Sequence, residues 1–197
     1  MALAVAVGLA VAGPDYLRAY VVRGDSDAPA YISEDRVLVN RAAYDLRFPH
    51  TGAVLVKLSD PKVGDMVLLR LLDDRLALKR VVAGPGARAM MHRNHLTIDG
   101  RALDYRLVSD NERPLVQRGP LGSVIEIERG NGPDVVVSHT LGTGLVEGFE
   151  ERQVLPAMYF VLGSNRDITV DSRSFGLVAR NRILGKVVAR VWSAPAR

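Results

Sequence analysis

The sequence predicts an all-β fold, and three observations lead to that prediction. Beyond residue 20, short Val-rich runs alternate with Gly, Pro and Asp, and few segments show the spacing of an amphipathic helix. The chain has 197 residues, which allows one domain or one domain with an insertion. Apolar residues make up 48% of the chain and charged residues 24%, as in a folded domain, so wholesale disorder is excluded.

Several runs are expected to form strands because they combine β-branched or aliphatic residues with flanking turn residues. In chain order they are residues 37–39, 54–56, 66–72, 76–83, 96–98, 124–127, 135–137, 159–162 and 185–192. The dipeptide Asp73-Asp74 is expected at the hairpin turn between the third and fourth of these runs. Asp99-Gly100 is typical of a tight hairpin turn after the fifth.

The composition changes between residues 84 and 156, where Gly, Arg and turn signals are more frequent than on either side. We therefore expect an antiparallel β-core that is formed by residues 20–84 and 156–192. The intervening residues 85–155 are expected to form an inserted, smaller β subdomain of hairpins and loops.

Residues 1–19 begin with an uncharged apolar run at positions 2–12. This run is shorter than the roughly 20 residues of a spanning helix, and its extension would include Pro14, Asp15 and Arg18. Three interpretations stay open: the remnant of a membrane anchor, the core of a signal peptide, or a buried strand or helix. The absence of Lys or Arg before the run argues against a cleavable signal peptide.

Charge and cysteine content exclude several classes of function. The formal net charge is +4, but acidic and basic residues are interleaved along the chain, so no nucleic-acid partner is expected. The chain has no cysteine, which excludes disulfides, cysteine zinc sites and thiol catalysis.

The segment GDSDAP at residues 24–29 superficially resembles the nucleophile motif of trypsin-like proteases, but the chain order excludes that mechanism. In those enzymes the catalytic His precedes the Ser, whereas all histidines of this chain follow Ser26. His92 and His95 lie close in sequence, but spacing suggests no third ligand beside them. We therefore expect no metal site and no cofactor.

Lys79 is a candidate general base. It lies in a run of residues, 76–82, that is otherwise almost entirely apolar. A lysine amine held neutral by apolar surroundings can remove the proton of a serine hydroxyl. The alternative is a lysine at a strand edge whose amine reaches water.

Separated segments of the chain resemble one family, the type I signal peptidases, which are membrane-anchored Ser/Lys proteases. Residues 159–176 read YFVLGSNRDITVDSRSFG, similar to the family's YFVMGDNRxxSxDSRxFG box. Residues 77–86 read ALKRVVAGPG, similar to VKRVVGLPGD, and residues 64–69 read GDMVLL, similar to GDIVVF. Residues 24–39 align less well with the family's nucleophile box.

The resemblance implies a Ser/Lys dyad in a catalytic β-core. Ser26 takes the position of the nucleophile and Lys79 that of the general base, and the Ser26 backbone N–H helps to bind the oxyanion. Thr169 stands where the family has a Ser that hydrogen-bonds the lysine amine. Gly24 stands where some members of the family have a Ser that assists the oxyanion hole. Arg80 is expected to fix the strand of Lys79 through charge contacts, and Asp171 and Arg173 match a pair that braces the site.

The resemblance also implies the substrate and the place of action. A signal peptide would bind as an added strand and be cleaved after a small-x-small motif. The residues expected to contact it are Asp25, Asp27, Leu76, Ala77 and Leu78. The other implied partner is a membrane lipid surface, with the catalytic domain on the extracytoplasmic side of the plasma membrane, where the positive charge would meet anionic head groups.

Two departures from the family pattern lie close to the expected site. Asp27 replaces a Met beside the nucleophile, and a carboxylate there can pair with Lys79 as ammonium and oppose its role as a base. Ser164 replaces an Asp of the C-terminal box. Two alternatives therefore stay open: a specialised maturation peptidase of a secretion or conjugation system, and a catalytically degenerate relative that binds signal peptides.

Overall fold

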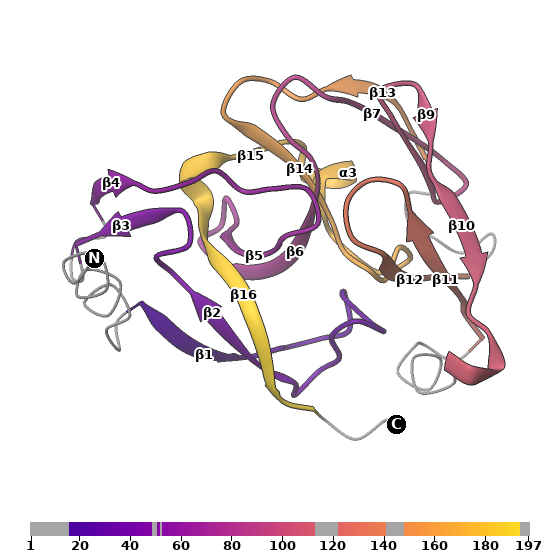
Figure 1. The fold of residues 1–197 in the computed structure, drawn as a ribbon, viewed down its shortest axis with the longest axis horizontal. Coiled ribbons are helices and arrows are strands. Elements are labelled where there is room, and N and C mark those ends of the chain that lie inside the picture. The colour runs from indigo at the N-terminus through magenta and orange to yellow at the C-terminus, as the bar shows by residue number, and fades with distance from the viewer. Residues whose placement is uncertain (1–15, 49–50, 52, 113–121, 141–147, 194–197) are drawn as a thin grey trace, which may run out of the picture.

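A seven-stranded antiparallel sheet forms the centre of the molecule in the computed structural model, which describes residues 16–48, 51, 53–112, 122–140 and 148–193 (Figure 1). Its strand order is β1-β2-β16-β5-β6-β14-β15. The bounds are β1 (Leu17–Val21), β2 (Arg36–Asn40), β5 (Met66–Arg70), β6 (Leu76–Ala83), β14 (Met158–Leu162), β15 (Val178–Ala179) and β16 (Ile183–Trp192). The predicted all-β fold is confirmed.

Three smaller sheets flank the central one. A four-stranded sheet contains β7 (Arg88–His92), β8 (His95–Ile98), β9 (Arg101–Ala102) and β13 (Phe149–Gln153). A three-stranded sheet contains β10 (Asp104–Leu107), β11 (Val124–Arg129) and β12 (Val135–His139), and β3 (Asp45–Arg47) pairs with β4 (Val54–Lys57). Figure 1 shows the β3–β4 pair at one end of the molecule and β10 at the other. The short helical turns are η1 (Asp110–Glu112), α3 (Ser172–Phe175) and η2 (Arg180–Arg182).

Each expected run falls on one strand. Several strands are longer than the run they contain, and only one run extends beyond its strand. The run at 66–72 was expected to extend two residues further than β5, which ends at Arg70 because Leu71 already begins the turn and donates its N–H to the Arg75 carbonyl at 2.8 Å. The Asp99-Gly100 turn is confirmed, with φ angles of 51° and 75° between β8 and β9. Positive φ at both central residues is typical of a type I′ hairpin turn.

The strands of the expected insertion form sheets of their own but share a hydrophobic core with the central sheet. Phe160 and Leu162 of β14 pack in one buried cluster with Met91 of β7 and Leu96 of β8. Apolar side chains therefore join the four-stranded sheet to the strand that carries the C-terminal sequence box, which restricts movement between the two parts.

The central sheet is covered on both faces next to the expected site. Successive side chains of a strand point to opposite faces. Leu68 packs with Val37 and Val39 on one face of β5, whereas Leu69 packs with Val81 on the other. The β5–β6 hairpin is consequently fixed on both sides at the level of Lys79.

The N-terminal expectation falls mostly outside the described residues. Residues 1–15 are not described, and residues 17–19 belong to the strand β1. Within the described parts of the chain, no helix has the length and apolar character needed to cross a membrane.

Candidate active site

Ser26 lies in a compact turn between β1 and β2. The turn begins at Gly24, whose φ of 79° is in the left-handed region that favours glycine. The Ala28 N–H donates to the Asp25 carbonyl at 3.1 Å, and the Asp25 side chain accepts a hydrogen bond from the Ser33 N–H at 2.9 Å. These contacts hold the serine hydroxyl toward β6.

Lys79 of β6 projects into the same place and is only 3% exposed. Its Nζ donates to Ser26 Oγ at 2.9 Å, to Asp27 Oδ2 at 3.1 Å and to the Leu78 carbonyl at 2.7 Å. An ammonium has three N–H donors, so the contacts satisfy the buried charge completely. The alternative in which the amine reaches bulk water does not fit this burial.

Asp27 is the third member of this cluster. Its Oδ2 accepts hydrogen bonds from both Ser26 Oγ, at 2.8 Å, and Lys79 Nζ. The ion pair between Asp27 and Lys79 requires the ammonium form of the lysine, whereas a general base must be neutral. The structure thus brings together the serine expected as nucleophile, the lysine expected as base and a carboxylate that pairs with the ammonium form of that lysine.

The loop after β14 holds the serine turn through two backbone N–H groups. The Asn165 N–H donates to the Ser26 carbonyl at 3.1 Å, and the Ser164 N–H donates to Asp27 Oδ1 at 3.4 Å. Gly163 permits this approach, because a Cβ at that position would lie 2.5 Å from the Ser26 carbonyl oxygen and would also strike Thr169. Gly163 is therefore required for the close contact of the two segments.

Asp171 and Arg173 form a buried ion pair behind the loop. Arg173 Nε lies 2.9 Å from Asp171 Oδ1, and its Nη2 lies 3.0 Å from Oδ2. Asp171 also accepts hydrogen bonds from the N–H groups of Arg173 and Gly163, each at 3.1 Å. The pair thus connects α3 to the loop that holds Ser26.

Two expected contacts of the site differ in the structure. Thr169 was expected to hydrogen-bond Lys79, but its Oγ1 is buried without a partner among the described residues, because the lysine donors are used elsewhere. Asp25 stabilises the serine turn and does not line the cavity beside it. Arg80 was expected to make charge contacts. It donates to the Gly64 carbonyl at 2.8 Å, and burial lowers its pKa, an effect that the charges of nearby carboxylates oppose.

A cavity of ≈ 270 Å³ opens beside the hydroxyl of Ser26. Of the residues expected to contact substrate, Asp27, Leu76, Ala77 and Leu78 line it. The full lining is Tyr20, Val21, Val22, Arg23, Ser26, Asp27, Leu68, Leu76, Ala77, Leu78 and Lys79. The cavity therefore combines Ser26, Asp27 and Lys79 with a mainly aliphatic wall that also includes Arg23.

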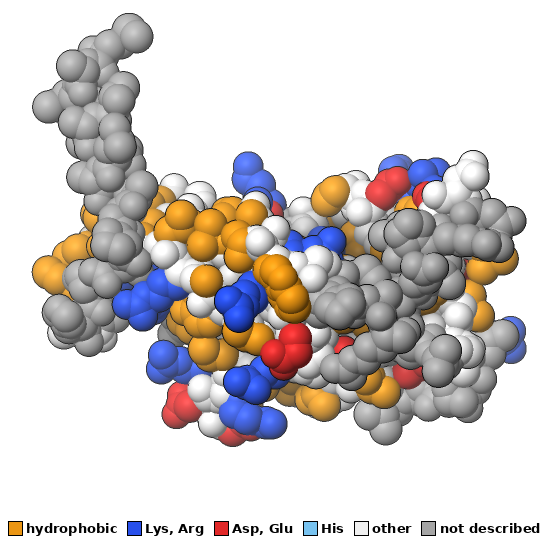
Figure 2. Space-filling model, turned by 90° about the horizontal axis from the view of Figure 1, so that it is seen from below, with side chains coloured by type: hydrophobic (Ala, Val, Ile, Leu, Met, Phe, Trp, Pro, Cys, Tyr) orange, Lys and Arg blue, Asp and Glu red, His pale blue; other side chains and the backbone are white. Residues whose placement is uncertain are grey.

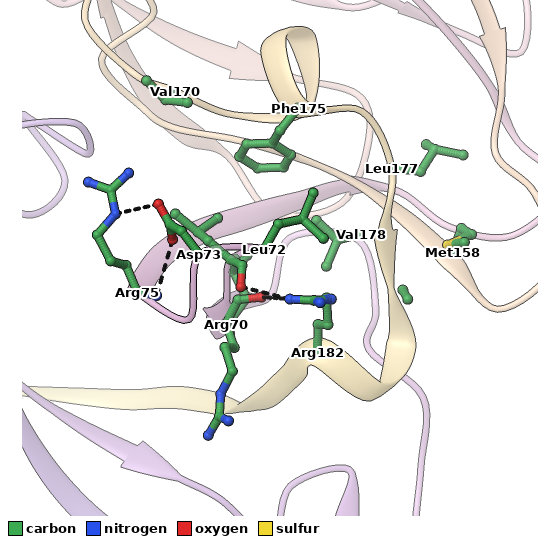
Figure 3. Close-up of a pocket in the computed structure, with 13 residues that line it drawn as sticks. Arg70, Leu72, Asp73, Arg75, Met158, Val170, Phe175, Leu177, Val178 and Arg182 are labelled. Atoms are coloured by element: carbon green, nitrogen blue, oxygen red, sulfur yellow. Dashed lines mark hydrogen bonds and ion pairs between the residues drawn. The ribbon is translucent and has the colours of Figure 1, made fainter.

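A larger cavity of ≈ 350 Å³ lies on the opposite face of the same hairpin (Figure 3). Its wall is mainly apolar, and Figure 3 shows Phe175 and Val178 beside the turn that Arg182 holds through the Leu71 carbonyl at 2.7 Å. No pair of nucleophile and base lies among its lining residues, so its size does not make it the reaction centre.

One polar cluster was missed from the sequence. His95 was considered only with His92, whereas the structure places it beside Glu126 and His139, with their ligand atoms within 4.8 Å of one another. These residues are far apart in the chain: the pairing of β11 with β12 places Glu126 near His139, and the approach of a second sheet, through β8, brings His95 to them. His92 instead precedes a two-residue turn at Arg93 and Asn94, both of which have positive φ.

Comparison with known proteins identifies the family of this chain. The chain is 26% identical over 185 residues to signal peptidase IB of Staphylococcus aureus, covering 93% of this chain and 82% of the relative. It is 28% identical over 173 residues to signal peptidase I of Bacillus caldolyticus, covering 88% and 78%. A crystal structure of a signal peptidase I from Enterococcus faecalis matches with a TM-score of 0.40 and 23% identity, covering 67% of this chain and all of that one. The family model for signal peptidase, peptidase S26, matches residues 1–192, and this chain therefore belongs to the S26 signal peptidase family.

Proposed function

We propose that this protein is a serine endopeptidase that removes signal peptides from exported preproteins after a small-x-small motif, with Ser26 as the nucleophile and Lys79 as the general base. The observation that supports this proposal best is the 2.9 Å separation of Lys79 Nζ and Ser26 Oγ in a site where the lysine is buried. Hydrogen-bond distance between nucleophile and base is the geometric requirement for such a dyad.

The reaction follows from the positions of these groups. Ser26 Oγ attacks the scissile carbonyl carbon while neutral Lys79 accepts the hydroxyl proton, and the carbonyl oxygen becomes an oxyanion. The Ser26 N–H makes no hydrogen bond within the described part of the chain and is available to that oxyanion. Lys79 then donates the proton to the leaving amine, and water hydrolyses the acyl-enzyme with Lys79 again as base.

Asp27 sets the starting state of this cycle. Because its carboxylate pairs with the ammonium of Lys79, the lysine must lose a proton before it can act. This contact favours a second candidate function, in which the protein binds signal peptides without cleaving them. The two candidates differ in whether the ammonium can be deprotonated when a peptide fills the cavity.

A signal peptide can add a strand at the free edge of β6. The strand β14 pairs with β6 only from Arg80 to Ala83, so residues 76–78 have no neighbour on that side within the described residues. An extended peptide at this edge would run past Lys79 and gain main-chain hydrogen bonds, while the small cavity would admit only short side chains. Small-x-small specificity follows from that arrangement.

The face that carries β1 and β16 is suited to a membrane surface. Figure 2 views the molecule from below, relative to Figure 1, and shows hydrophobic side chains together with Lys and Arg on the face turned to the viewer. The exposed apolar residues of these strands are Leu17, Val21, Val188, Val191 and Trp192. Apolar groups that enter the interface and cations that meet anionic head groups would hold the catalytic domain at the extracytoplasmic side of the plasma membrane, where exported preproteins emerge.

Incubation of the purified protein with a preprotein that carries an Ala-x-Ala site tests the proposal. We expect cleavage at that site and its loss in both Ser26→Ala and Lys79→Met, whereas the matched control Lys62→Met, an exposed lysine, keeps full activity. Cleavage that persists in the first two variants would contradict the dyad. Peptide binding without cleavage by the unmodified protein, across several preproteins, would support the binding function instead.

A further inference from the structure

We propose that His95, Glu126 and His139 form a binding site for a divalent transition-metal ion of the zinc type. Nε2 of each histidine lies 3.0 Å from the same carboxylate oxygen, Glu126 Oε2. All three atoms lie within 4.8 Å of one another. The site is separate from the proposed catalytic dyad and does not depend on the function proposed for it.

The fold holds the ligands at the junction of the two inserted sheets. His95 begins β8 of the four-stranded sheet, whereas Glu126 and His139 belong to the paired strands β11 and β12. Val124 lies opposite His139 in this ladder, so Glu126 and His139 are diagonal neighbours on one face. A bound ion would therefore add a second link between two sheets that the Leu96 N–H already joins by donating to the Tyr105 hydroxyl at 2.9 Å.

The rings are oriented before any ion binds. The imidazole of His95 stacks on Tyr105 with a centroid distance of 3.9 Å and an interplanar angle of 16°. The Tyr105 hydroxyl donates to the buried carboxylate of Glu128, which in turn pairs with the buried Arg166 at 2.8 Å. This chain of contacts restricts the His95 ring, although the side chain is 46% exposed.

The set of donor atoms matches zinc chemistry. Two imidazole nitrogens and one carboxylate oxygen are a common set of three protein ligands for zinc, with water as the fourth ligand. At metal–ligand distances of about 2.0 to 2.2 Å, tetrahedral geometry places ligand atoms about 3.4 Å apart. Each histidine nitrogen lies 3.0 Å from the carboxylate oxygen and all three atoms lie within 4.8 Å of one another, so modest rotations of the side chains would complete the site.

Two buried atoms without partners support this assignment independently. His139 is 4% exposed and its Nδ1 has no hydrogen-bond partner among the described residues, and the same is true of Asp167 Oδ1. The Asp167 carboxylate is held against this end of β12, because its Oδ2 accepts a hydrogen bond from the Thr140 N–H at 2.7 Å. An ion on Nε2 of His139 leaves the ring proton on Nδ1, and histidine ligands commonly donate that proton to a carboxylate. Asp167, which is held beside His139 in this way, is the carboxylate that we expect to accept the Nδ1 proton.

The site is connected to the active-site loops through Ser138, the residue before His139. Ser138 Oγ donates to the Ala28 carbonyl at 3.0 Å, within the serine turn. The Ser138 N–H donates to the Ser164 carbonyl at 2.9 Å, and its own carbonyl accepts from the Arg166 N–H at 2.8 Å. An ion at the end of β12 would therefore stabilise the frame that holds Ser26, as a structural metal does.

Titration of the chelator-treated full-length protein with zinc chloride at neutral pH, followed by calorimetry, tests the site. We expect saturable binding of one ion per chain and a higher melting temperature in zinc than in magnesium, which prefers oxygen ligands. Cobalt chloride in place of zinc should give the visible absorption bands of a tetrahedral site.

Ligand variants decide the assignment. We expect His95→Ala and Glu126→Gln to lower zinc affinity by at least about 100-fold, and Asp167→Asn by about 10-fold, as for an outer ligand partner. His92→Ala, a matched control directly opposite His95 across the turn of the same hairpin, should bind as the unmodified protein does. His95 is partly exposed, so its variant should fold even if a change at His139 does not. Absence of saturable binding, or equal binding by His95→Ala and Glu126→Gln, would overturn the proposal.

Discussion

Two buried ion pairs lie within the same part of the molecule, and they differ in the number of contacts between cation and carboxylate and in what else shares the carboxylate oxygens. Asp171 and Arg173 meet through two parallel contacts of 2.9 and 3.0 Å, and both oxygens also accept a backbone N–H. Asp27 and Lys79 meet through a single contact of 3.1 Å, at an oxygen that Ser26 also uses. The first pair is a fork-to-fork interaction with fixed orientation, and the second joins a point charge to a shared oxygen.

This difference indicates a structural role for the Asp171–Arg173 pair and a chemical role for the Asp27–Lys79 pair. A guanidinium stays protonated under all conditions that proteins meet, so the Asp171–Arg173 pair can only hold structure. A lysine amine can lose its proton when its surroundings favour the neutral form, so the Asp27–Lys79 pair can be broken during a reaction. Both pairs act on the same loop, and changes to each should therefore affect different quantities.

The largest effect is expected from Arg173→Met. Removal of the arginine leaves the Asp171 carboxylate buried without its charge partner, and such a change costs about 3 to 5 kcal/mol of unfolding free energy. Urea denaturation measures this loss as a lower midpoint with an unchanged slope. Arg88→Met is the control, because that arginine is exposed and its ion pair should contribute at most about 1 kcal/mol. A similar loss in both variants would contradict the assigned role of the buried pair.

A smaller effect, on activity, is expected from Gly163→Ala. The added methyl group would collide with the Ser26 carbonyl oxygen and push the serine turn away from Lys79. Displacement of a reacting group by about 1 Å lowers the rate by about 100-fold, which kcat/KM for a preprotein would measure. Gly84→Ala is a matched control, since its nearest neighbour would be 3.8 Å away, and full activity is expected. Equal activity of the two variants would show that the close approach is not required.

Asp27→Met should raise kcat/KM for a preprotein by about 10-fold. The reason is that the Asp27 carboxylate holds Lys79 Nζ in an ion pair at 3.1 Å, and its removal leaves the lysine amine to the Ser26 hydroxyl. Asp27→Asn keeps the shape without the charge and should raise kcat/KM in the same direction. Unchanged kcat/KM in both variants would contradict the proposed restraint on Lys79.

The sequence was informative where side chains alternate or where a family motif is present. Runs such as residues 37–39 and 76–83 contain Val or Leu at buried positions, and they form strands as expected. The strands β1 and β13, whose side chains are mostly exposed, were missed, whereas the equally exposed β4 was expected from its Val and Leu residues. The residues of β13, FEERQ, are four-fifths exposed, and β1 lies at the edge of the central sheet.

The site could be predicted only as far as local motifs reach. Ser26 and Lys79 were suggested together by resemblance, whereas the shared oxygen of Asp27 depends on side-chain direction that sequence does not specify. The grouping of His95 with residues 31 and 44 positions later depends on how two separate sheets approach each other. A long-range arrangement of this kind is not contained in any single segment of the chain.

The smallest effect is expected from Thr169→Val. This variant tests whether the buried hydroxyl of Thr169, which lies between the two ion pairs, contributes to stability. Thr169 Oγ1 is buried and has no hydrogen-bond partner in the described part of the chain. It lies beside Gly163, whose N–H donates to Asp171 and whose Cα faces the Ser26 carbonyl. A buried hydroxyl without a hydrogen bond is unfavourable, so replacement by an apolar group of the same shape should raise the unfolding free energy by up to about 1 kcal/mol. Urea denaturation measures that gain, and a loss of stability would show that the hydroxyl has a partner. A parallel fall in kcat/KM would indicate that Thr169 turns to Lys79 once the Asp27 contact is released.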